Sequence, residues 1–525
     1  MPILHIRNTG QLGLAVDVPF EALPLNAWTA CQNMRFRDGA AERFLGHSQS
    51  YGTLQCAPYW LFPYNDGTTQ FWLYGGLTKV GATDGASHAD ISRTVGGAYA
   101  TDLEIGWTGT VIEGIPVVNN GVDEPQMWNT PDLGTPLAAL SNWPASTICS
   151  AMRGYKGYLV ALDVTKSGTR YPFMVKWSHR AAAGAVPSSW DETDPAVDAA
   201  EYLLPAEGGL VVDGAQLRDF MVIYKEYQTW LMQFVGGIDI FRFTRIFDSF
   251  GAFSRRCAAE FFSGQQLVFT GDDLVLHDGQ QAKSLLDTRA RNLVRGNVDS
   301  TYYRRAFLTV NYQRQEVWAC YPETGNSQPN VALVWNWKDN TLGLRDLPPA
   351  AHIAAGIVDP IEATETWSGA VGTWDTDLAA WGDRSFDPSQ RTLLMADSVN
   401  SKLFLLESTE QFDGVDFTSY VQRVGLGFPL KQDGPPDFET MKMLSKVWPH
   451  IVGQAGETIN VYIGTQQSIN GPVTWGSARS FVIGTSKFID CRAAGRLHAL
   501  KFEATGSFAW KIDGFSVEIR SMGML

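Results

Sequence analysis

Hydrophobic residues along this chain occur in short runs separated by turn-forming residues. The clearest runs are only five or six residues long and are rich in β-branched and aromatic side chains, a pattern typical of strands and too short for helices. Between residues 46 and 425 they fall at 70–74, 158–162, 220–224, 266–270, 316–321, 331–335 and 402–406. Only a few segments look helical, the best being residues 282–294, with Leu285, Leu286, Leu293 and Val294 on one face. We expect helix to account for less than about a fifth of the chain.

Turn signals separate these runs at regular intervals. Asp-Gly occurs at 38, 66, 84, 213, 278, 413, 433 and 513, and Asn-Gly at 120 and 470. Both dipeptides tolerate the positive φ angles of type I′ hairpin turns. The runs form clusters roughly 40 to 60 residues apart, each usually with a Trp or Tyr, which is the spacing of propeller blades. We expect an all-β protein whose core is a β-propeller with loop insertions.

A proline-rich break at 434–437 divides this region from the C-terminal part of the chain. Beyond it, residues 458–463, 480–483, 497–502 and 515–519 alternate apolar and polar positions, as half-buried antiparallel strands do. The expected organisation is an N-terminal arm at 1–45, the propeller at 46–433 and a small C-terminal antiparallel β domain at 434–525.

Composition and charge narrow the classes of function. The 525 residues are 45% hydrophobic and 18% charged, and 41 Lys and Arg face 55 Asp and Glu, for a formal net charge of −14. This balance disfavours general electrostatic capture of nucleic acid or anionic lipid. No secretory signal or apolar stretch of about 18 residues is present, so we expect synthesis in a reducing cytoplasm and no stable membrane insertion. The six dispersed cysteines are expected to be free and mostly buried, without disulfides or a zinc site.

Catalytic motifs are missing from the sequence. It has no phosphate-binding loop, HExxH, GxSxG or GxGxxG pattern, and no Asp-box turn of the sialidase type. His277 is the only histidine crowded by carboxylates, at Asp272, Asp273 and Asp278, and we interpret it as part of a structural turn. We expect no enzymatic activity, cofactor or metal.

Charges of opposite sign are segregated along the chain. Residues 191–219 and 359–387 are strongly acidic, whereas 283–314 are basic, with Lys283, Arg289, Arg291, Arg295, Arg304, Arg305 and Arg314. Such runs are commonly solvated faces. They also suit a subunit that docks on identical neighbours. The acidic stretch 359–387 also contains Trp367, Trp374 and Trp381 at intervals of seven residues.

Several segments follow one another in a distinctive order: 23–28 followed by 33–46, Lys-Trp-Ser at 176–178 with Ser-Trp-Asp at 189–191, 220–232 through 269–279, and 495–502 with 510–515. This order resembles that of the tail nozzle, or packaged-DNA-stabilisation, proteins of short-tailed bacteriophages. The resemblance covers most of the chain, although no segment is a chemical signature. It implies a virion tail protein with a propeller core, six copies in a ring, and a lumen that retains and then conducts double-stranded DNA. Implied partners are an adaptor or head-to-tail connector, a tail fibre or tailspike, and a tail needle or plug.

Two sets of residues then become candidate sites. The basic residues of 283–314 are expected at a subunit or adaptor interface. The acidic side chains expected to line the lumen, where they would repel phosphate, are Asp191, Glu192, Asp194, Asp198, Asp375 and Asp377. Two alternatives stay open: a receptor-facing propeller that binds or cleaves bacterial surface glycan, with two carboxylates in one groove, and a binding module with a Trp-rich sugar platform.

Overall fold

The computed structural model describes residues 3–262, 264–358, 391–431, 434–469 and 471–523. Within them the chain forms forty strands and a single α-helix, α1 (Arg291–Asn297). Three short 3-10 segments complete the regular structure: η1 (Phe20–Ala22), η2 (Gly237–Asp239) and η3 (Tyr303–Arg305). The expectation of a nearly all-β chain is confirmed.

Most of the strands belong to a propeller of seven four-stranded antiparallel blades, counted over the described residues. Blade one is β6 (Trp60–Asn65), β7 (Gln70–Gly75), β8 (Val80–Thr83) and β9 (His88–Asp90). Blade two is β10 (Thr108–Ile112), β11 (Ile115–Asn119), β12 (Gln126–Met127) and β13 (Ala138–Ala139). Blade three is β14 (Thr147–Tyr155), β15 (Tyr158–Lys166), β16 (Thr169–Trp177) and β17 (Ala200–Leu203). Blade four is β18 (Val211–Leu217), β19 (Phe220–Lys225), β20 (Thr229–Phe234) and β21 (Phe241–Phe247).

The remaining blades follow the same order along the chain. Blade five is β22 (Ala258–Phe262), β23 (Gln265–Phe269), β24 (Leu274–His277) and β25 (Ala282–Ser284). Blade six is β26 (Phe307–Asn311), β27 (Glu316–Tyr321), β28 (Val331–Asn336) and β29 (Thr341–Asp346). Blade seven is β30 (Ala350–Gly356), β31 (Thr392–Asp397), β32 (Lys402–Leu406) and, from the N-terminal part of the chain, β5 (His47–Ser50).

The ring closes by pairing strands that lie far apart in the sequence. The first strand of each blade packs beside the first strand of the next from β10 through to β30, and β30 packs beside β6, so these strands surround the axis. In blade seven, β5 is the outer strand, and its Ser50 lies opposite Leu403 of β32. Because β5 leads directly into blade one, these hydrogen bonds tie the two ends of the ring together.

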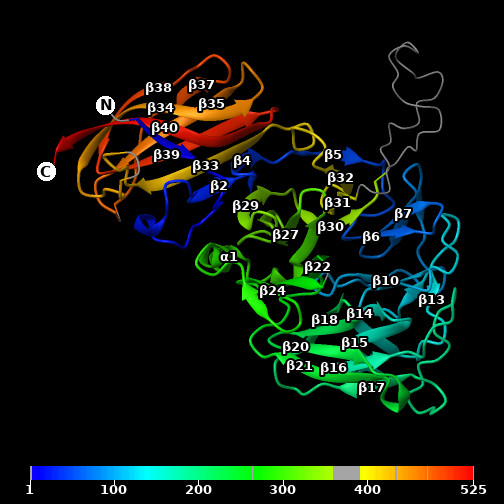
Figure 1. Ribbon diagram of the computed structural model, residues 1–525. Coiled ribbons are helices and arrows are strands. Elements are labelled where there is room, and N and C mark those ends of the chain that lie inside the picture. The colour runs from blue at the N-terminus through cyan, green and yellow to red at the C-terminus, as the bar shows by residue number, and fades with distance from the viewer. Residues whose placement is uncertain (1–2, 263, 359–390, 432–433, 470, 524–525) are drawn as a thin grey trace, which may run out of the picture.

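The second body is a sandwich of two antiparallel sheets at the end of the molecule that carries both termini (Figure 1). One sheet contains β3 (Met34–Arg37), β4 (Ala40–Arg43), β40 (Trp510–Gly523), β34 (Met441–Gly453) and β38 (Ile489–Gly495), with β1 (Ile3–Arg7) also on β40. The other contains β2 (Ala30–Gln32), β33 (Phe417–Leu426), β39 (Leu497–Gly506), β35 (Thr458–Gln466), β36 (Thr474–Trp475) and β37 (Arg479–Val482). The first of these sheets continues into blade six, because Met34 of β3 pairs with Leu344 of β29.

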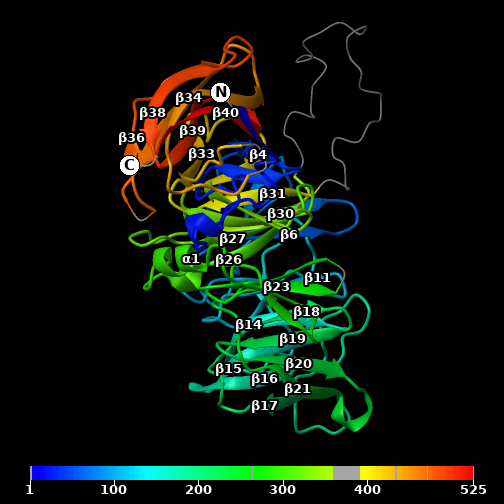
Figure 2. The ribbon, with the colours of Figure 1, turned by 60° about the vertical axis from the view of Figure 1, so that its left-hand side comes forward.

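The N-terminal segment is thus shared between the two bodies. Strands β1 to β4 pair with the sandwich, and β5 closes the propeller. The divisions expected at residues 45 and 434 stay predictions, since strand pairing joins all three segments. Figure 2 shows the two bodies from a second direction, with the sandwich above the stacked blades.

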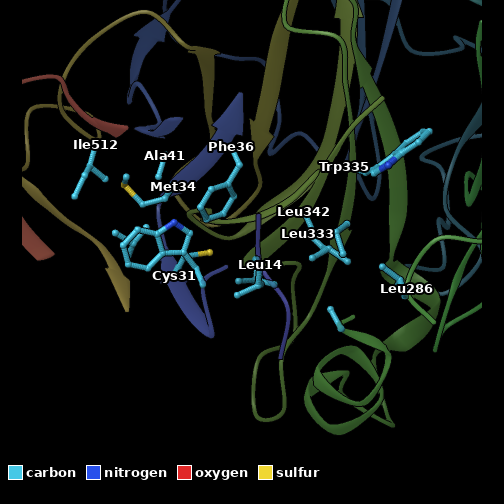
Figure 3. Close-up of a cluster of buried hydrophobic side chains, with 14 of the residues drawn as sticks. Leu14, Cys31, Met34, Phe36, Ala41, Leu286, Leu333, Trp335, Leu342 and Ile512 are labelled. Carbon is cyan, nitrogen blue, oxygen red and sulfur yellow. The ribbon is translucent and has the colours of Figure 1, made fainter. Parts of the chain in front are cut away.

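One hydrophobic cluster runs from the propeller into the sandwich. Met34 and Phe36 lie between Leu333 and Leu342 of blade six and Ile512 of the sandwich (Figure 3), and all five are at most 1% exposed. Burial of apolar surface stabilises a fold by about 25 cal/mol per Å². The two bodies therefore share a core, and we expect them to be fixed relative to each other.

The expected helix at 282–294 is wrong in its boundaries. Residues 282–284 pair with β24 as the outer strand of blade five, and Thr288 has a left-handed backbone with φ of 62°. A helix cannot continue through that conformation, so α1 begins only at Arg291. Leu285 and Leu286 are buried, which accounts for the apolar spacing.

The Asp-Gly dipeptides predicted type I′ hairpin turns correctly at only some positions. Positive φ at both turn residues, as in type I′, occurs at Asp38-Gly39 and Asp413-Gly414, but Asp213-Gly214 lies within β18. Several other Asp-Gly turns work differently: the Asp66 carboxylate, for example, accepts the N–H groups of Thr68 and Thr69. Asp is favoured in such turns because its side chain can replace a backbone acceptor.

Two further findings concern the cysteines and the prediction of no stable membrane insertion. All six cysteines are free, and only Cys56 is not buried. Among the described residues, no helix is both long and apolar enough to cross a membrane.

Candidate functional site: the axial cavity of the propeller

A hollow lined by the innermost strands lies at the propeller axis, and we call it the axial cavity. Its volume is about 320 Å³, within the range of small-ligand sites. Strands β6, β10, β14, β22, β26 and β30, the innermost strands of six blades, contribute to its wall. The seventh innermost strand, β18, supplies Asp213 behind the wall.

A carboxylate joins two arginines at this wall. Asp213 accepts two hydrogen bonds from the Arg153 side chain, at 2.9 Å from Nε and 2.8 Å from Nη2. Its Oδ2 atom also accepts the backbone N–H of Arg256 at 2.9 Å. Burial opposes ionisation of Asp213, but the charge of Arg153 and these hydrogen bonds hold its pKa below the usual value. Asp213 therefore remains ionised and neutralises one arginine.

The Arg256 side chain is the least satisfied group at the cavity. Its Nε and Nη1 atoms are inaccessible to solvent and have no hydrogen-bond partner. The pKa of Arg256 is lowered to about 10, mainly by burial and also by the nearby charge of Arg153. The guanidinium is thus still charged at neutral pH. A buried, unpaired charge is costly in a protein.

Arg256 also limits the length of the cavity. Arg256 and Trp107 line both the axial cavity and a second hollow of only about 20 Å³, whose wall includes Arg305 and Tyr59. This smaller hollow has room for about one water molecule. Arg256 and Trp107 therefore lie at the boundary between the two hollows.

One wall of the cavity is aromatic and another carries a histidine. Trp60 stacks on Phe62 and on Trp107, with ring centroids 5.4 and 6.2 Å apart. His352 accepts the backbone N–H of Leu61 through Nδ1 at 3.1 Å, which leaves the proton of the neutral ring on Nε2. Burial, with help from the charge of Arg256, lowers the pKa of His352 well below its normal value.

The chemistry of the axial cavity is that of a cationic site. Arg153, Arg256 and Arg391 line it, and no Asp or Glu is among its lining residues in the described part of the chain. Hydrolysis of a glycoside generally requires two carboxylates flanking the bond. The described residues also contain no group of three or more His, Cys, Asp and Glu that could hold a metal ion.

Sequence patterns gave little indication of this site. Arg153, Asp213 and Arg256 come from three blades and are some 40 to 60 residues apart, so no local motif connects them. The available signal was a single charged residue within an otherwise apolar strand, as at 151–153 in β14. Such isolated charges in short strands indicate a propeller axis or a buried pair.

The structure separates the seven basic residues of the expected interface into those that bind within the chain and those that do not. Several of its side chains bind within the chain: Arg291 pairs with Asp272 at 2.9 Å, Arg305 with Glu104 at 2.9 Å, and Arg314 approaches Glu407 at 3.8 Å. Arg289 donates to the carbonyl of Asn340 at 2.7 Å, and Arg304 donates to the Tyr303 hydroxyl at 3.1 Å. Lys283 and Arg295 are exposed and form no ion pair with the described residues. A role in subunit contacts stays a prediction, and these last two residues are the cations most available for it.

Four of the expected lumen acids, Asp191, Glu192, Asp194 and Asp198, lie in the loop between β16 and β17 of blade three, at the side of the blade away from the propeller axis. The carboxylates of Asp191 and Asp194 are exposed and accept backbone N–H groups two residues later. Asp198 accepts the Tyr158 hydroxyl at 3.0 Å. Asp375 and Asp377, like Trp367, Trp374 and Trp381, are outside the described residues. Whether any of them borders a lumen stays a prediction.

Glu192 differs from its neighbours because it binds two lysines. Its carboxylate accepts Lys176 at 2.5 Å and Lys166 at 2.9 Å, and the Lys176 side chain is only 1% exposed. Partial burial raises the pKa of Glu192, but the hydrogen bonds and charges of the lysines outweigh it and lower the pKa to about 2. Glu192 thus neutralises buried charge within blade three.

Seven closed four-stranded blades define the class of the protein: it is a β-propeller with an attached β-sandwich. No protein-family model matches the chain, and no curated protein matches it. Among solved structures, the extracellular domain of a hybrid two-component system from B. thetaiotaomicron is similar at 10% identity and a TM-score of 0.40. That alignment covers 84% of this chain and 48% of the other, so the chain spans about half the length of that structure.

A second similar structure is the WD40 β-propeller domain of Doa1. It aligns at 10% identity and a TM-score of 0.37, over 69% of this chain and 97% of that one. The assignment to the propellers rests on the seven sheets and their closure by β5.

Proposed function

We propose that this chain is a structural subunit of a bacteriophage tail, a nozzle ring of the short-tailed type, with the DNA lumen between its copies. The order of segments described from the sequence motivates the proposal. The observation that carries it is the junction of the two bodies, which share a hydrophobic core and a buried cluster of charges. A ring subunit that holds DNA under load needs its two bodies fixed in one orientation.

The junction ion cluster consists of Arg35, Arg314, Arg345, Glu316 and Glu407. Glu407 binds both Arg35, at 2.5 Å, and Arg345, while Glu316 lies 3.5 Å from Arg35. The side chains of Arg35, Arg345 and Glu316 are at most 3% exposed. Arg35 lies on β3, Arg345 on β29, and Glu407 directly follows β32, so one carboxylate links the sandwich sheet to two blades.

The size of the axial cavity determines where DNA would pass. A DNA duplex, whose major groove alone is about 12 Å wide, cannot enter a cavity of about 320 Å³. In the proposed ring, the lumen is therefore formed by the outer surfaces of several copies. The net charge of −14 per chain suits such a passage because it gives phosphate few places to adhere.

Assembly state tests the proposal most directly. The purified full-length chain is examined by native mass spectrometry and by electron microscopy at the highest soluble concentration. The expected particles are closed rings of six copies with an axial opening. A monodisperse 57.8 kDa monomer under all these conditions would refute the nozzle proposal.

The glycan alternatives remain open predictions. Among the described residues, the axial cavity lacks the paired carboxylates that glycan cleavage would need, and Trp60 and Trp107 are at most 3% exposed. Neither ring can therefore serve as an open sugar platform. Saturable binding or depolymerisation of a bacterial surface polysaccharide by the purified monomer would favour those alternatives over the nozzle.

A further inference from the structure

We propose that the axial cavity is a binding site for a phosphate dianion, either free or as the terminal group of a phosphate monoester. This inference is independent of the tail proposal. It rests on the charge of the cavity wall, on the three guanidinium groups that line it and on the size of the hollow.

The charge of the wall matches a dianion. Arg153, Arg256 and Arg391 line the cavity, and Asp213, which binds Arg153 from behind, is the one carboxylate in contact with this group in the described residues. Three positive charges and one negative charge leave a surplus of two. A phosphate monoester carries about −1.5 to −2 at neutral pH, so it would neutralise the wall.

The hydrogen-bonding geometry also favours an oxyanion. A guanidinium offers five N–H donors in a planar fork that matches phosphate or carboxylate. Arg153 already uses Nε and Nη2 on Asp213, which fixes its plane against that carboxylate. Arg256 is held through its backbone N–H on the same Asp213, while its side-chain Nε and Nη1 find no partner. These two atoms are enclosed by protein, so Arg256 contributes positive charge to the wall, and the donors open to a ligand are the remaining N–H groups of the lining arginines.

The surroundings make the site selective for a small ligand. The Trp60, Phe62 and Trp107 rings pack on each other at one wall, and a Cβ atom at Gly109 would lie only 2.7 Å from the Trp60 ring. That packing leaves little room for the wall to move. Low-dielectric walls strengthen the attraction between an anion and fixed cations. A compact phosphate group therefore fits, whereas a nucleic-acid backbone does not.

Binding is tested with inorganic phosphate and with glycerol phosphate on the full chain, by titration calorimetry at constant ionic strength set with NaCl. We expect saturable one-to-one binding, and at least a tenfold rise in Kd for Arg256→Met. Arg242→Met is the matched control, because Arg242 is exposed on β21 and outside the cavity; its Kd should not change. Binding of glycerol phosphate as well as phosphate identifies a monoester site, and binding of phosphate alone identifies a free-ion site.

The proposal is overturned if phosphate does not bind saturably, if acetate at the same ionic strength binds more tightly, or if Arg256→Met binds as the parent does. Should Arg256→Met fail to fold, Arg391→Met provides the same test. Arg391 lines the cavity but is exposed, so its loss should leave the fold intact and weaken phosphate binding at least threefold. An unchanged Kd in that variant would equally overturn the assignment.

Discussion

Substitution of Glu407 by Gln tests whether the junction ion cluster fixes the two bodies together. Gln keeps the size and one acceptor oxygen of the side chain but removes its charge. Among the described residues, Arg35, with a side chain 3% exposed, would then keep only Glu316 as an ion-pair partner, and Arg345, with a side chain 0% exposed, would keep none. Breaking a buried ion pair by removing one partner costs about 3–5 kcal/mol, because the remaining charge stays buried. We expect the free energy of unfolding to fall by that amount.

The assay is urea unfolding followed by tryptophan fluorescence, since the chain contains 18 Trp. Lys338→Met is the control, because it breaks the exposed pair between Lys338 and Asp38, whose side chains are 49% and 58% exposed. Screened surface pairs contribute little, so this variant should unfold as the parent does. A loss below about 1 kcal/mol in Glu407→Gln, comparable to a surface pair, would show that the cluster does not hold the junction.

Further predictions concern acid stability, assembly and DNA passage. Burial lowers the pKa of His277 to about 4, below its value of about 6.5 in the unfolded chain. Between these pH values the unfolded chain binds more protons than the folded one, so the free energy of unfolding decreases as pH falls from 6.5 to 4. His277→Gln should reduce the slope of the unfolding free energy against pH by about 1.4 kcal/mol per pH unit in that window. An unchanged slope, measured by urea unfolding at several pH values, would contradict this prediction. The double variant Lys283→Glu and Arg295→Glu should stay folded by circular dichroism but weaken ring assembly in native mass spectrometry; full assembly at low salt would mean that this face is merely solvated. Asp191→Lys should slow genome ejection in a salt-sensitive way if the loop borders the lumen, and normal ejection from assembled particles would place it elsewhere.

Local patterns were sufficient for the strands but not for their pairing. Short apolar runs such as 70–74 and 316–321 became β7 and β27 because no other conformation buries them in so few residues. The partner of β5, in contrast, lies more than 350 residues later in β32. The sequence of His47–Ser50 does not indicate this pairing, because the pattern of its side chains indicates only which face of the strand is buried.

Turn chemistry shows a similar limit. Type I′ conformations also occur at Glu113-Gly114, Lys156-Gly157 and Ser167-Gly168, where the first residue has no special preference for positive φ. There the closely paired strands impose the conformation, and the glycine tolerates it. At these positions tertiary pairing decided the turn, so the Asp-Gly and Asn-Gly signal could not find them.

Prediction of the axial cavity from the sequence would also have required knowledge of which distant strands lie side by side. Arg256 follows Arg255 in a segment that the sequence analysis did not single out, and its significance appears only when β14, β18 and β22 meet around the axis. A charge count over a linear window averages such residues with their neighbours. The same linear count selected the seven-residue basic set, although five of its members bind partners within the chain.

The shared N-terminal segment has a consequence for synthesis. Arg35 and Glu407 are 372 residues apart, and at about 5–20 residues per second the ribosome needs roughly 20–75 s to deliver the second after the first. During that interval β1, β2 and β5 have no partners and β4 has only β3, so their unpaired edges are open to non-native pairing. Blades one to six can form in order as they emerge, but the ring and the junction are completed only when the chain has reached β32 and the sandwich strands. Folding of this protein is therefore gated by translation of its last quarter, and a ribosome that stalls before that point holds an open propeller with an unprotected N-terminal segment.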